Sequence, residues 1–261
     1  MHQGGARWWA GAGALVVGLA MQLGVNFAND FSDYVRGADS KRVGPLRASS
    51  SGVVAPEHVR WAAVAAFGVA GLVGLALSLA VDWRLLIVGA ACLGAGWLYT
   101  GGPKPYGYLG LGELFVFVFF GLVATVGTVY LETGRVTALA ILMGGGMGLL
   151  ATAILIMNNL RDIETDAAAG KRTLATMIGR ERTRWLLVVI VSAAFAVPIV
   201  VFVTMLAPVT IMLVHFGIPI ASVPVRTAFA TTSPPALVKG LRRMAMTQLA
   251  YALLFTLGVL L

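Results

Sequence analysis

Charged residues are scarce in this chain, and cysteine is nearly absent. Of 261 residues, 11% are Asp, Glu, Lys or Arg, whereas soluble domains carry about 25%. With 59% hydrophobic residues, the chain lacks the polar surface that a water-soluble protein of this size needs. A soluble enzyme and a disordered chain are therefore excluded. The single cysteine, Cys92, excludes an intrachain disulfide and a metal site built from cysteines. An integral membrane protein remains.

Long apolar runs are abundant, and they predict about eight membrane spans, since a helix needs about 20 residues to cross a bilayer. We expect these spans at residues 8–34, 59–81, 83–100, 110–131, 136–160, 185–206, 208–224 and 244–261. The third and the seventh are short. Glycines are frequent inside the spans, and small residues let membrane helices approach closely. The predicted fold is an all-α transmembrane bundle that forms a single domain over residues 1–261.

The net charge of +8 suggests nucleic-acid binding at first, but the positions of the basic residues indicate membrane topology instead. If the loops alternate between the two sides, all but three of the 19 Lys and Arg residues fall on one side. The exceptions are Arg7, Arg84 and Arg135. By the positive-inside rule the basic side is cytoplasmic. We therefore expect a multi-pass protein of the inner (plasma) membrane, with both ends of the chain outside and no nucleic-acid partner.

Acidic residues number only 11, and most of them gather at the cytoplasmic ends of two spans. Two polar strips each place an amide and two carboxylates at helical spacing: Asn26, Asp30 and Asp33, then Asn158, Asp162 and Asp166. Each trio lies on one helix face. Several carboxylates at a membrane helix end are costly unless a cation or a cavity accommodates them. The strips therefore predict a functional site.

The chemistry of the two strips favours a bound divalent metal. Carboxylates with an amide carbonyl suit Mg²⁺, which commonly also binds substrate phosphates. The strips share an offset of 132 residues, and each is followed by a glycine and a Lys-Arg pair. This repetition predicts two parallel halves, each offering one strip to a shared cytoplasmic cavity that holds a metal-bound diphosphate. The alternative is that the carboxylates pair with loop arginines and only cap helices.

The two strips resemble the Asp-rich motifs of the UbiA superfamily of membrane prenyltransferases. Three stretches narrow the resemblance to 1,4-dihydroxy-2-naphthoate polyprenyltransferases of menaquinone biosynthesis. They are Arg36-Gly-Ala-Asp39 with Gly44-Pro45-Leu-Arg47, then Tyr99 through Tyr106-Gly-Tyr108 to Glu113, and Asn158 through Lys171-Arg172-Thr173. The resemblance covers the whole chain in order. The Asp motifs alone indicate only the superfamily. The other stretches indicate which aromatic acceptor the resembled enzymes use.

The resemblance implies an activity as well as a fold. It implies nine membrane helices, two Mg²⁺ ions and a polyprenyl diphosphate donor. The implied reaction prenylates 1,4-dihydroxy-2-naphthoate, giving demethylmenaquinol, pyrophosphate and CO₂. The family begins with one further helix that carries an Arg-Pro-Arg-Thr-type stretch, and we expect this chain to lack it. Alternatives are another aromatic acceptor, 4-hydroxybenzoate or homogentisate, or a membrane transporter.

The expected site residues form three groups. Asp30, Asp33, Asp162 and Asp166 are the expected catalytic carboxylates and metal ligands, with Asn26 and Asn158 as further oxygen donors. Four basic residues take up the charge on pyrophosphate: Arg47, Arg161, Lys171 and Arg172. Three tyrosines enclose the allyl cation through cation–π contacts: Tyr99, Tyr106 and Tyr108.

Three of the aromatic and acidic residues have a second interpretation. Tyr99 and Tyr106 fit an interfacial aromatic belt equally well. Glu113 is a candidate proton acceptor, or a helix-start residue that complements the helix dipole. The prenyl tail is expected to leave sideways between helices into the bilayer.

Overall fold

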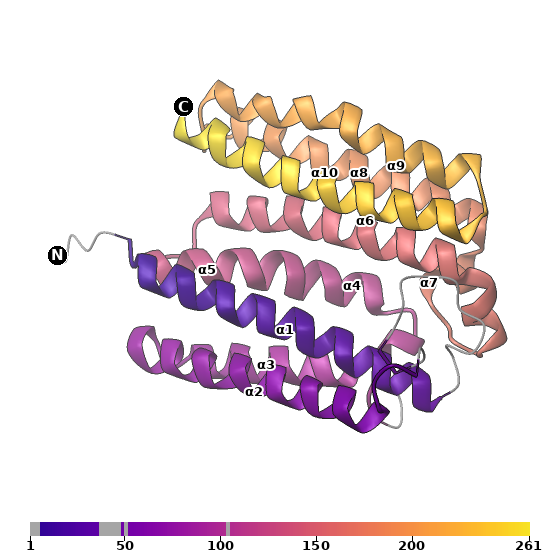
Figure 1. Ribbon diagram of the computed structural model, residues 1–261. Helices are drawn as coiled ribbons and strands as arrows, with labels where there is room; N and C mark the ends of the chain where they lie inside the picture. Colours follow the sequence, from indigo (N-terminus) through magenta and orange to yellow (C-terminus); the bar gives the residue numbers. More distant parts are fainter. Residues whose placement is uncertain (1–5, 37–47, 50–51, 103–104) are drawn as a thin grey trace. The chain divides into compact units, whose positions relative to one another are not determined.

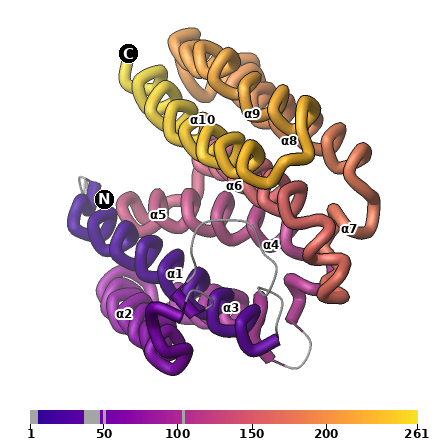
Figure 2. The backbone as a smooth tube through the Cα atoms, turned by 45° about the vertical axis from the view of Figure 1, so that its right-hand side comes forward, coloured from indigo at the N-terminus to yellow at the C-terminus, as the bar shows by residue number. Residues whose placement is uncertain are grey.

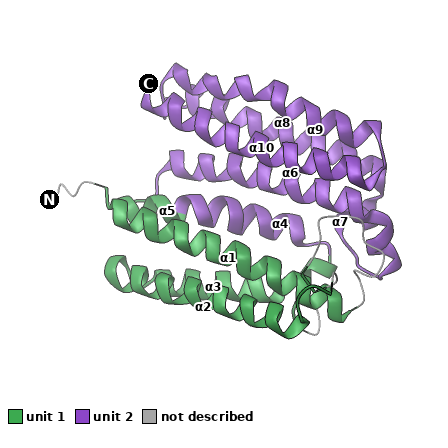
Figure 3. Cartoon of the chain, viewed as in Figure 1, with its two compact units in different colours: residues 1–109, 127–135 green, residues 110–126, 136–261 purple. Residues whose placement is uncertain are grey.

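The computed structural model describes residues 6–36, 48–49, 52–102 and 105–261. Every regular element in these ranges is a helix and none is a strand, which confirms the all-α prediction. The chain divides into two compact units (Figure 3). The first comprises residues 1–109 and 127–135, and the second comprises residues 110–126 and 136–261. The predicted loop 44–47 lies outside the described residues.

The first unit is built on a pair of long helices with two shorter elements. Its elements are α1 (Trp8–Val35), α2 (Pro56–Val81), α3 (Leu85–Leu98) and the 3₁₀ turn η1 (Tyr106–Tyr108) (Figure 1). Helices α1 and α2 pack along each other. A Cβ added at Gly24 would lie 2.9 Å from the Phe67 ring. Such close packing replaces the hydrophobic drive that lipid does not supply.

The second unit surrounds one long central helix, α6. Its elements are α4 (Gly112–Val116), the π-helix η2 (Phe117–Val123), α6 (Ala138–Ala168), α7 (Leu174–Ile178), α8 (Arg180–Val203), the 3₁₀ helix η3 (Val209–Gly217), α9 (Ile218–Ala230) and α10 (Pro234–Leu260). Helices α8 and α10 and η2 all pack against α6. Figure 2 shows α10 in yellow alongside α6. Gln248 on α10 donates a hydrogen bond to the Met147 carbonyl of α6 at 3.1 Å.

The π-helix η2 meets α6 at backbone distance. A Cβ built at Gly121 would lie 2.2 Å from the Cα of Gly148, and one built at Gly148 would lie 2.7 Å from the Phe117 carbonyl oxygen. Only glycine fits at either position without a shift of the backbone. A π-helical turn is rare in proteins and occurs frequently at functional sites. Here it continues α4 into α5 (Ala124–Thr133) to form one span, Gly112–Thr133.

Seven helices of the described residues are long and apolar enough to cross a membrane. The third predicted span, 83–100, contains α3, which has 14 residues and is about 21 Å long at the α-helical rise. It is therefore shorter than the other seven. The last predicted span begins ten residues too late, because Lys239, Arg242 and Arg243 lower the hydropathy of a segment that is already helical.

Candidate active site

The first acidic motif lies in the last two turns of α1, and its carboxylates are buried. Asp30 is 6% exposed and Asp33 is 4% exposed. The carboxylate of Asp30 accepts hydrogen bonds from the backbone N–H groups of Ala48, at 2.9 Å, and Ser49, at 3.3 Å. The carboxylate of Asp33 accepts one from the Tyr108 hydroxyl at 2.8 Å. These donors fix both side chains, so the motif is a built site and not a solvated helix end.

Arg36 ties the end of α1 to the turn that follows α3. Its guanidinium donates hydrogen bonds to the carbonyls of Thr100 and Gly102. It also lies over the Tyr108 ring, 5.3 Å from the centroid. The Thr100 hydroxyl donates to Oδ1 of Asn29 at 2.7 Å. One basic residue, one helical turn after Asp33, thus orders the loop that carries the tyrosines.

The three predicted tyrosines lie together, but their hydroxyls differ in role. Tyr99 and Tyr106 pack edge to face with ring centroids 5.4 Å apart, and the Tyr106 hydroxyl donates to the Ala95 carbonyl at 2.7 Å. Burial raises the pKa of Tyr106 above its usual range. Burial first, and then the charge of Asp33, raises the pKa of Tyr108 as well. Both phenols therefore stay neutral at physiological pH, and Tyr108 remains a donor to Asp33.

The second acidic motif lies near the end of α6, and its members are also buried. Asp162 is 8% exposed, Asp166 is 9% exposed and Arg161 is 4% exposed. Arg161 donates from Nε to one oxygen of Asp162 at 2.6 Å and from a terminal nitrogen to the other. A buried carboxylate requires such a partner. A metal ion at Asp162 would therefore share the carboxylate with this guanidinium.

A depression of about 420 Å³ opens beside the second motif. Lys171, Arg172, Gly170 and Thr176 are among its lining residues. The ammonium of Lys171 lies 3.8 Å from the carboxylate of Asp166. Thr173 caps the following helix α7 by accepting a hydrogen bond from the Thr176 N–H. The depression thus brings two basic side chains, Lys171 and Arg172, close to Asp166 at the end of α6.

The sequence matches the UbiA prenyltransferase family over residues 1–260. The chain belongs to this family. It is therefore a prenyltransferase, and its long apolar helices make it a multi-pass membrane protein.

Three proteins similar to this chain carry one name, 1,4-dihydroxy-2-naphthoate octaprenyltransferase. The protein of Mycobacterium tuberculosis is 46% identical over 202 residues, which cover 77% of this chain and 68% of that protein. The Haemophilus influenzae protein is 36% identical over 253 residues, covering 94% and 82%. The Escherichia coli protein is 38% identical over 191 residues, covering 68% and 62%.

The two buried motifs of this prenyltransferase have the donor chemistry of a divalent metal site. Prenyltransferases of the UbiA family generally depend on a divalent metal. Within the described residues, no group of three or more His, Cys, Asp or Glu side chains is placed to hold a metal ion. Mg²⁺ commonly uses one or two carboxylates and completes its shell with substrate phosphates and water. The carboxylate pair of each motif fits that mode of binding.

Some of the predicted site residues of the prenyltransferase are not buried like the carboxylates, or lie outside the described residues. Asn26 is exposed and Asn158 is half-buried, so their roles as metal ligands stay predictions. Arg172 is exposed at the pocket mouth. Arg47 lies outside the described residues.

The sequence predictions missed one buried contact of the second unit. The side-chain amide of Asn159 donates to Oε1 of Glu113 at 2.9 Å, and the two residues are 6% and 9% exposed. Glu113 had only a helix-start or proton-acceptor interpretation, and Asn159 had none. The sequence did contain a sign of a role for Asn159, because this residue lies next to Asn158 and three residues before Asp162.

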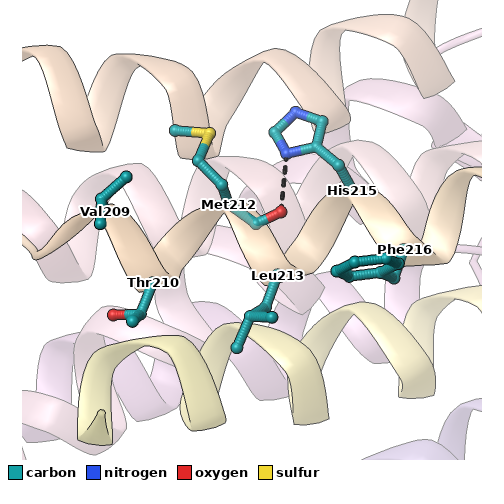
Figure 4. Close-up of a pocket in the computed structure, with 6 residues that line it drawn as sticks. All are labelled: Val209, Thr210, Met212, Leu213, His215 and Phe216. Carbon is teal, nitrogen blue, oxygen red and sulfur yellow. Dashed lines mark hydrogen bonds between the residues drawn. The ribbon is translucent and has the colours of Figure 1, made fainter.

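A second depression, of about 460 Å³, lies on η3 and is lined by apolar side chains with His215 (Figure 4). Nδ1 of His215 lies 3.1 Å from the Met212 carbonyl oxygen. Thr210, at the start of η3, donates to the Gly258 carbonyl near the end of α10. Because α10 and α6 run antiparallel, this depression lies at the end of the unit opposite Asp162. It takes no part in the candidate active site.

Proposed function

We propose that this prenyltransferase transfers a polyprenyl group from polyprenyl diphosphate to 1,4-dihydroxy-2-naphthoate, giving demethylmenaquinol for menaquinone biosynthesis. The allylic C–O bond breaks and a new C–C bond forms on the naphthoate ring, and pyrophosphate and CO₂ leave. The observation that carries this proposal is a pair of buried carboxylates at the end of each of two membrane helices, Asp30 with Asp33 and Asp162 with Asp166. The names of the relatives support the acceptor.

The carboxylates of both motifs are proposed to hold Mg²⁺, with Asn26 and Asn158 as further oxygen donors. When bound, Mg²⁺ would neutralise the charge that develops on the leaving pyrophosphate. One feature of the first motif supports a phosphate ligand. The Ser49 hydroxyl is buried and has no hydrogen-bond partner among the described residues, while its backbone N–H bonds to Asp30. A diphosphate oxygen would satisfy this hydroxyl.

Basic side chains of the second unit are proposed to bind the diphosphate. Lys171 and Arg172 line the polar depression, and Arg161 is already buried against Asp162. These cations stabilise negative charge on the departing pyrophosphate, which is where the transition state differs most from the bound donor. Arg47 is proposed to act with them.

Two of the three predicted tyrosines are proposed to shield the allyl cation from water. Tyr99 and Tyr106 present neutral, half-buried rings. The ring of Tyr108 already makes a cation–π contact with Arg36, so Tyr108 serves Asp33 rather than the allyl cation in this proposal. The electron-rich naphthoate ring then attacks. The tail of the donor is expected to extend between helices into the lipid.

The reaction is proposed to occur on the cytoplasmic side of the inner membrane. This assignment follows from the basic loops, which share a side with the ends of α1 and α6 that carry the acidic motifs.

A competition between acceptors tests the proposed function. The protein, purified in detergent, is given geranylgeranyl diphosphate, Mg²⁺ and equal amounts of 1,4-dihydroxy-2-naphthoate, 4-hydroxybenzoate and homogentisate, and the products are identified by mass spectrometry. We expect prenylated product only from the naphthoate, and none with EDTA. Asp162→Asn should lower turnover by about 10²–10³-fold.

The matched control is Glu164→Gln, two residues along the same helix, where the side chain is 70% exposed. It should stay near wild type. Faster turnover of either other acceptor would replace the proposed acceptor, and full activity in EDTA would contradict the metal site.

A further inference from the structure

Glu113 is a buried carboxyl at the start of a membrane span, and its position needs an explanation. It lies in the first turn of α4 and is 9% exposed. An acidic residue complements the helix dipole at this position, but an exposed side chain does so equally well. Glu181 in the first turn of α8 is an exposed example in the same unit. Burying a charge is costly unless it is paired, so the inward orientation of Glu113 serves something else.

The partner of Glu113 belongs to the helix that carries the second acidic motif. Asn159 of α6 donates from Nδ2 to Oε1 of Glu113 at 2.9 Å. Two helical turns earlier on the same face of α6, the Thr152 hydroxyl donates to the Glu113 backbone carbonyl at 3.3 Å. Glu113 is thus joined to α6 at two positions that are two helical turns apart. The contact fixes how α6 is rotated about its own axis next to α4.

The hydrogen bond also fixes the orientation of the Asn159 amide. In this bond Asn159 presents its NH₂ group to Oε1 of Glu113. Its carbonyl oxygen is then directed away from the carboxylate. Asn159 precedes Asp162 by three residues and Asp166 by seven, and these spacings place all three on one face of α6.

We propose that Glu113 is a positioning residue for the second acidic motif, and that it orients Asn159 as an additional oxygen ligand of the divalent metal. The proposal rests on the proposed function, because it needs a metal-bound diphosphate. Hydrogen-bond partners of metal ligands orient those ligands, and removing one commonly costs about 10–100-fold in metal affinity. Glu113 acts through Asn159 and has no contact of its own with the substrate.

A metal-binding measurement tests this role without relying on turnover. Mn²⁺ binding to the purified protein is titrated by EPR in the presence of inorganic pyrophosphate, and thermal unfolding in detergent confirms that each variant is folded. Glu113→Met keeps the volume of the side chain but removes the acceptor, and it should weaken Mn²⁺ affinity about 10–100-fold. Glu113→Gln retains a carbonyl oxygen for Asn159 and should bind Mn²⁺ nearly as tightly as wild type.

Three further variants make the result decisive. Asn159→Ala should show the same loss as Glu113→Met, and the double variant should lose no more than either single one, since both remove one interaction. Glu181→Met is the matched control from another first turn of the same unit, and it should bind normally. If Glu113→Met does not fold, Asn159→Ala alone carries the test.

Each contrary outcome overturns a distinct claim. Normal Mn²⁺ affinity in folded Glu113→Met or in Asn159→Ala overturns the positioning role. If Glu113→Gln loses as much Mn²⁺ affinity as Glu113→Met, the positioning role is also overturned, because Glu113→Gln keeps an acceptor for the hydrogen bond from Asn159. If wild type binds no Mn²⁺ with pyrophosphate, the proposed function fails as well. If Asp162→Asn abolishes binding and Glu113→Met does not, only the inference fails.

Discussion

At the residue scale, the aspartates of each acidic motif are held in place by hydrogen-bond donors that are not themselves acidic residues. The carboxylate of Asp33 accepts a hydrogen bond from the Tyr108 hydroxyl, and the carboxylate of Asp162 accepts hydrogen bonds from the Arg161 guanidinium. Buried carboxylates without such partners would take up protons instead of staying charged. The geometry of the motifs therefore depends on residues that the spacing of the aspartates does not reveal.

Tyr108→Phe tests this dependence at the first motif. The change removes the hydroxyl that donates to Asp33 at 2.8 Å and keeps the ring that lies beneath Arg36. We expect the Mg²⁺ concentration for half-maximal prenyl transfer to rise about tenfold, because one carboxylate loses its orienting partner. The measurement is turnover as a function of Mg²⁺ concentration at saturating donor.

The control for Tyr108→Phe is Tyr34→Phe, at the residue after Asp33, where the side chain is 44% exposed. It should leave the Mg²⁺ dependence unchanged. A Tyr108→Phe variant with a normal Mg²⁺ dependence and a lower maximal rate would instead place the hydroxyl at the reacting substrate.

At the element scale, hydropathy predicted the membrane spans well, since seven of the eight predicted spans correspond to long apolar helices of the described residues. Helical spacing placed Asn26, Asp30 and Asp33 on one face of α1, but Asn26 is exposed whereas the two aspartates are buried. Apolar length alone identifies a membrane helix, because every backbone group must be bonded within it. Two features could not be found this way. The π-helix η2 depends on how Phe117–Val123 packs against α6, and the Glu113–Asn159 bond joins residues 46 apart in the chain. Both are tertiary contacts, which periodicity does not contain.

The close approach of η2 and α6 predicts a sharp difference between two glycines of one helix. A Cβ at Gly148 would lie 2.7 Å from the Phe117 carbonyl oxygen, whereas a Cβ at Gly145 would have no neighbour within 4 Å. Gly148→Ala should therefore lower the free energy of unfolding by about 1–3 kcal/mol through overpacking. Gly145→Ala should be neutral, or stabilising by up to about 1 kcal/mol, since alanine favours the helix.

Chemical or thermal unfolding in detergent compares the two glycine variants. Equal stability of the two would mean that η2 and α6 do not meet at backbone distance. A loss of stability in Gly145→Ala but not in Gly148→Ala would mean that η2 packs against the face of α6 that carries Gly145, and not the face that carries Gly148.

At the scale of the whole molecule, the repeat in the sequence and the compact units have different boundaries. The offset of 132 residues between the acidic motifs divides the chain near residue 135. The second compact unit, however, includes residues 110–126. The first half of the span Gly112–Thr133 packs against α6 through Glu113 and Gly121. The contacts of this first half, which the repeat does not encode, assign residues 110–126 to the second unit, whereas residues 127–135 belong to the first.

Hydrogen bonds from two arginines show which helix ends of the second unit lie together. Arg180 donates to the Leu160 carbonyl of α6 at 2.9 Å, and Arg184 donates to the Ala228 carbonyl of α9 at 2.7 Å. The turn between α9 and α10 therefore lies at the same end of the second unit as Asp162. Helix α6 begins at the other end of this unit, at Ala138, and Arg135 precedes it by three residues in the chain. By the positive-inside rule, the proposed orientation has the first of these ends facing the cytoplasm.

Single cysteines report this orientation directly. The native Cys92 is replaced by serine, and one cysteine is introduced by Ser233→Cys or by Arg135→Cys, both at exposed positions. A membrane-impermeant maleimide should label Arg135→Cys in intact cells, and it should label Ser233→Cys only after the membrane is opened. Retained prenyl transfer shows that each variant is folded. Labelling of Ser233→Cys in intact cells would place the second acidic motif on the outer side and would contradict the proposed site of reaction.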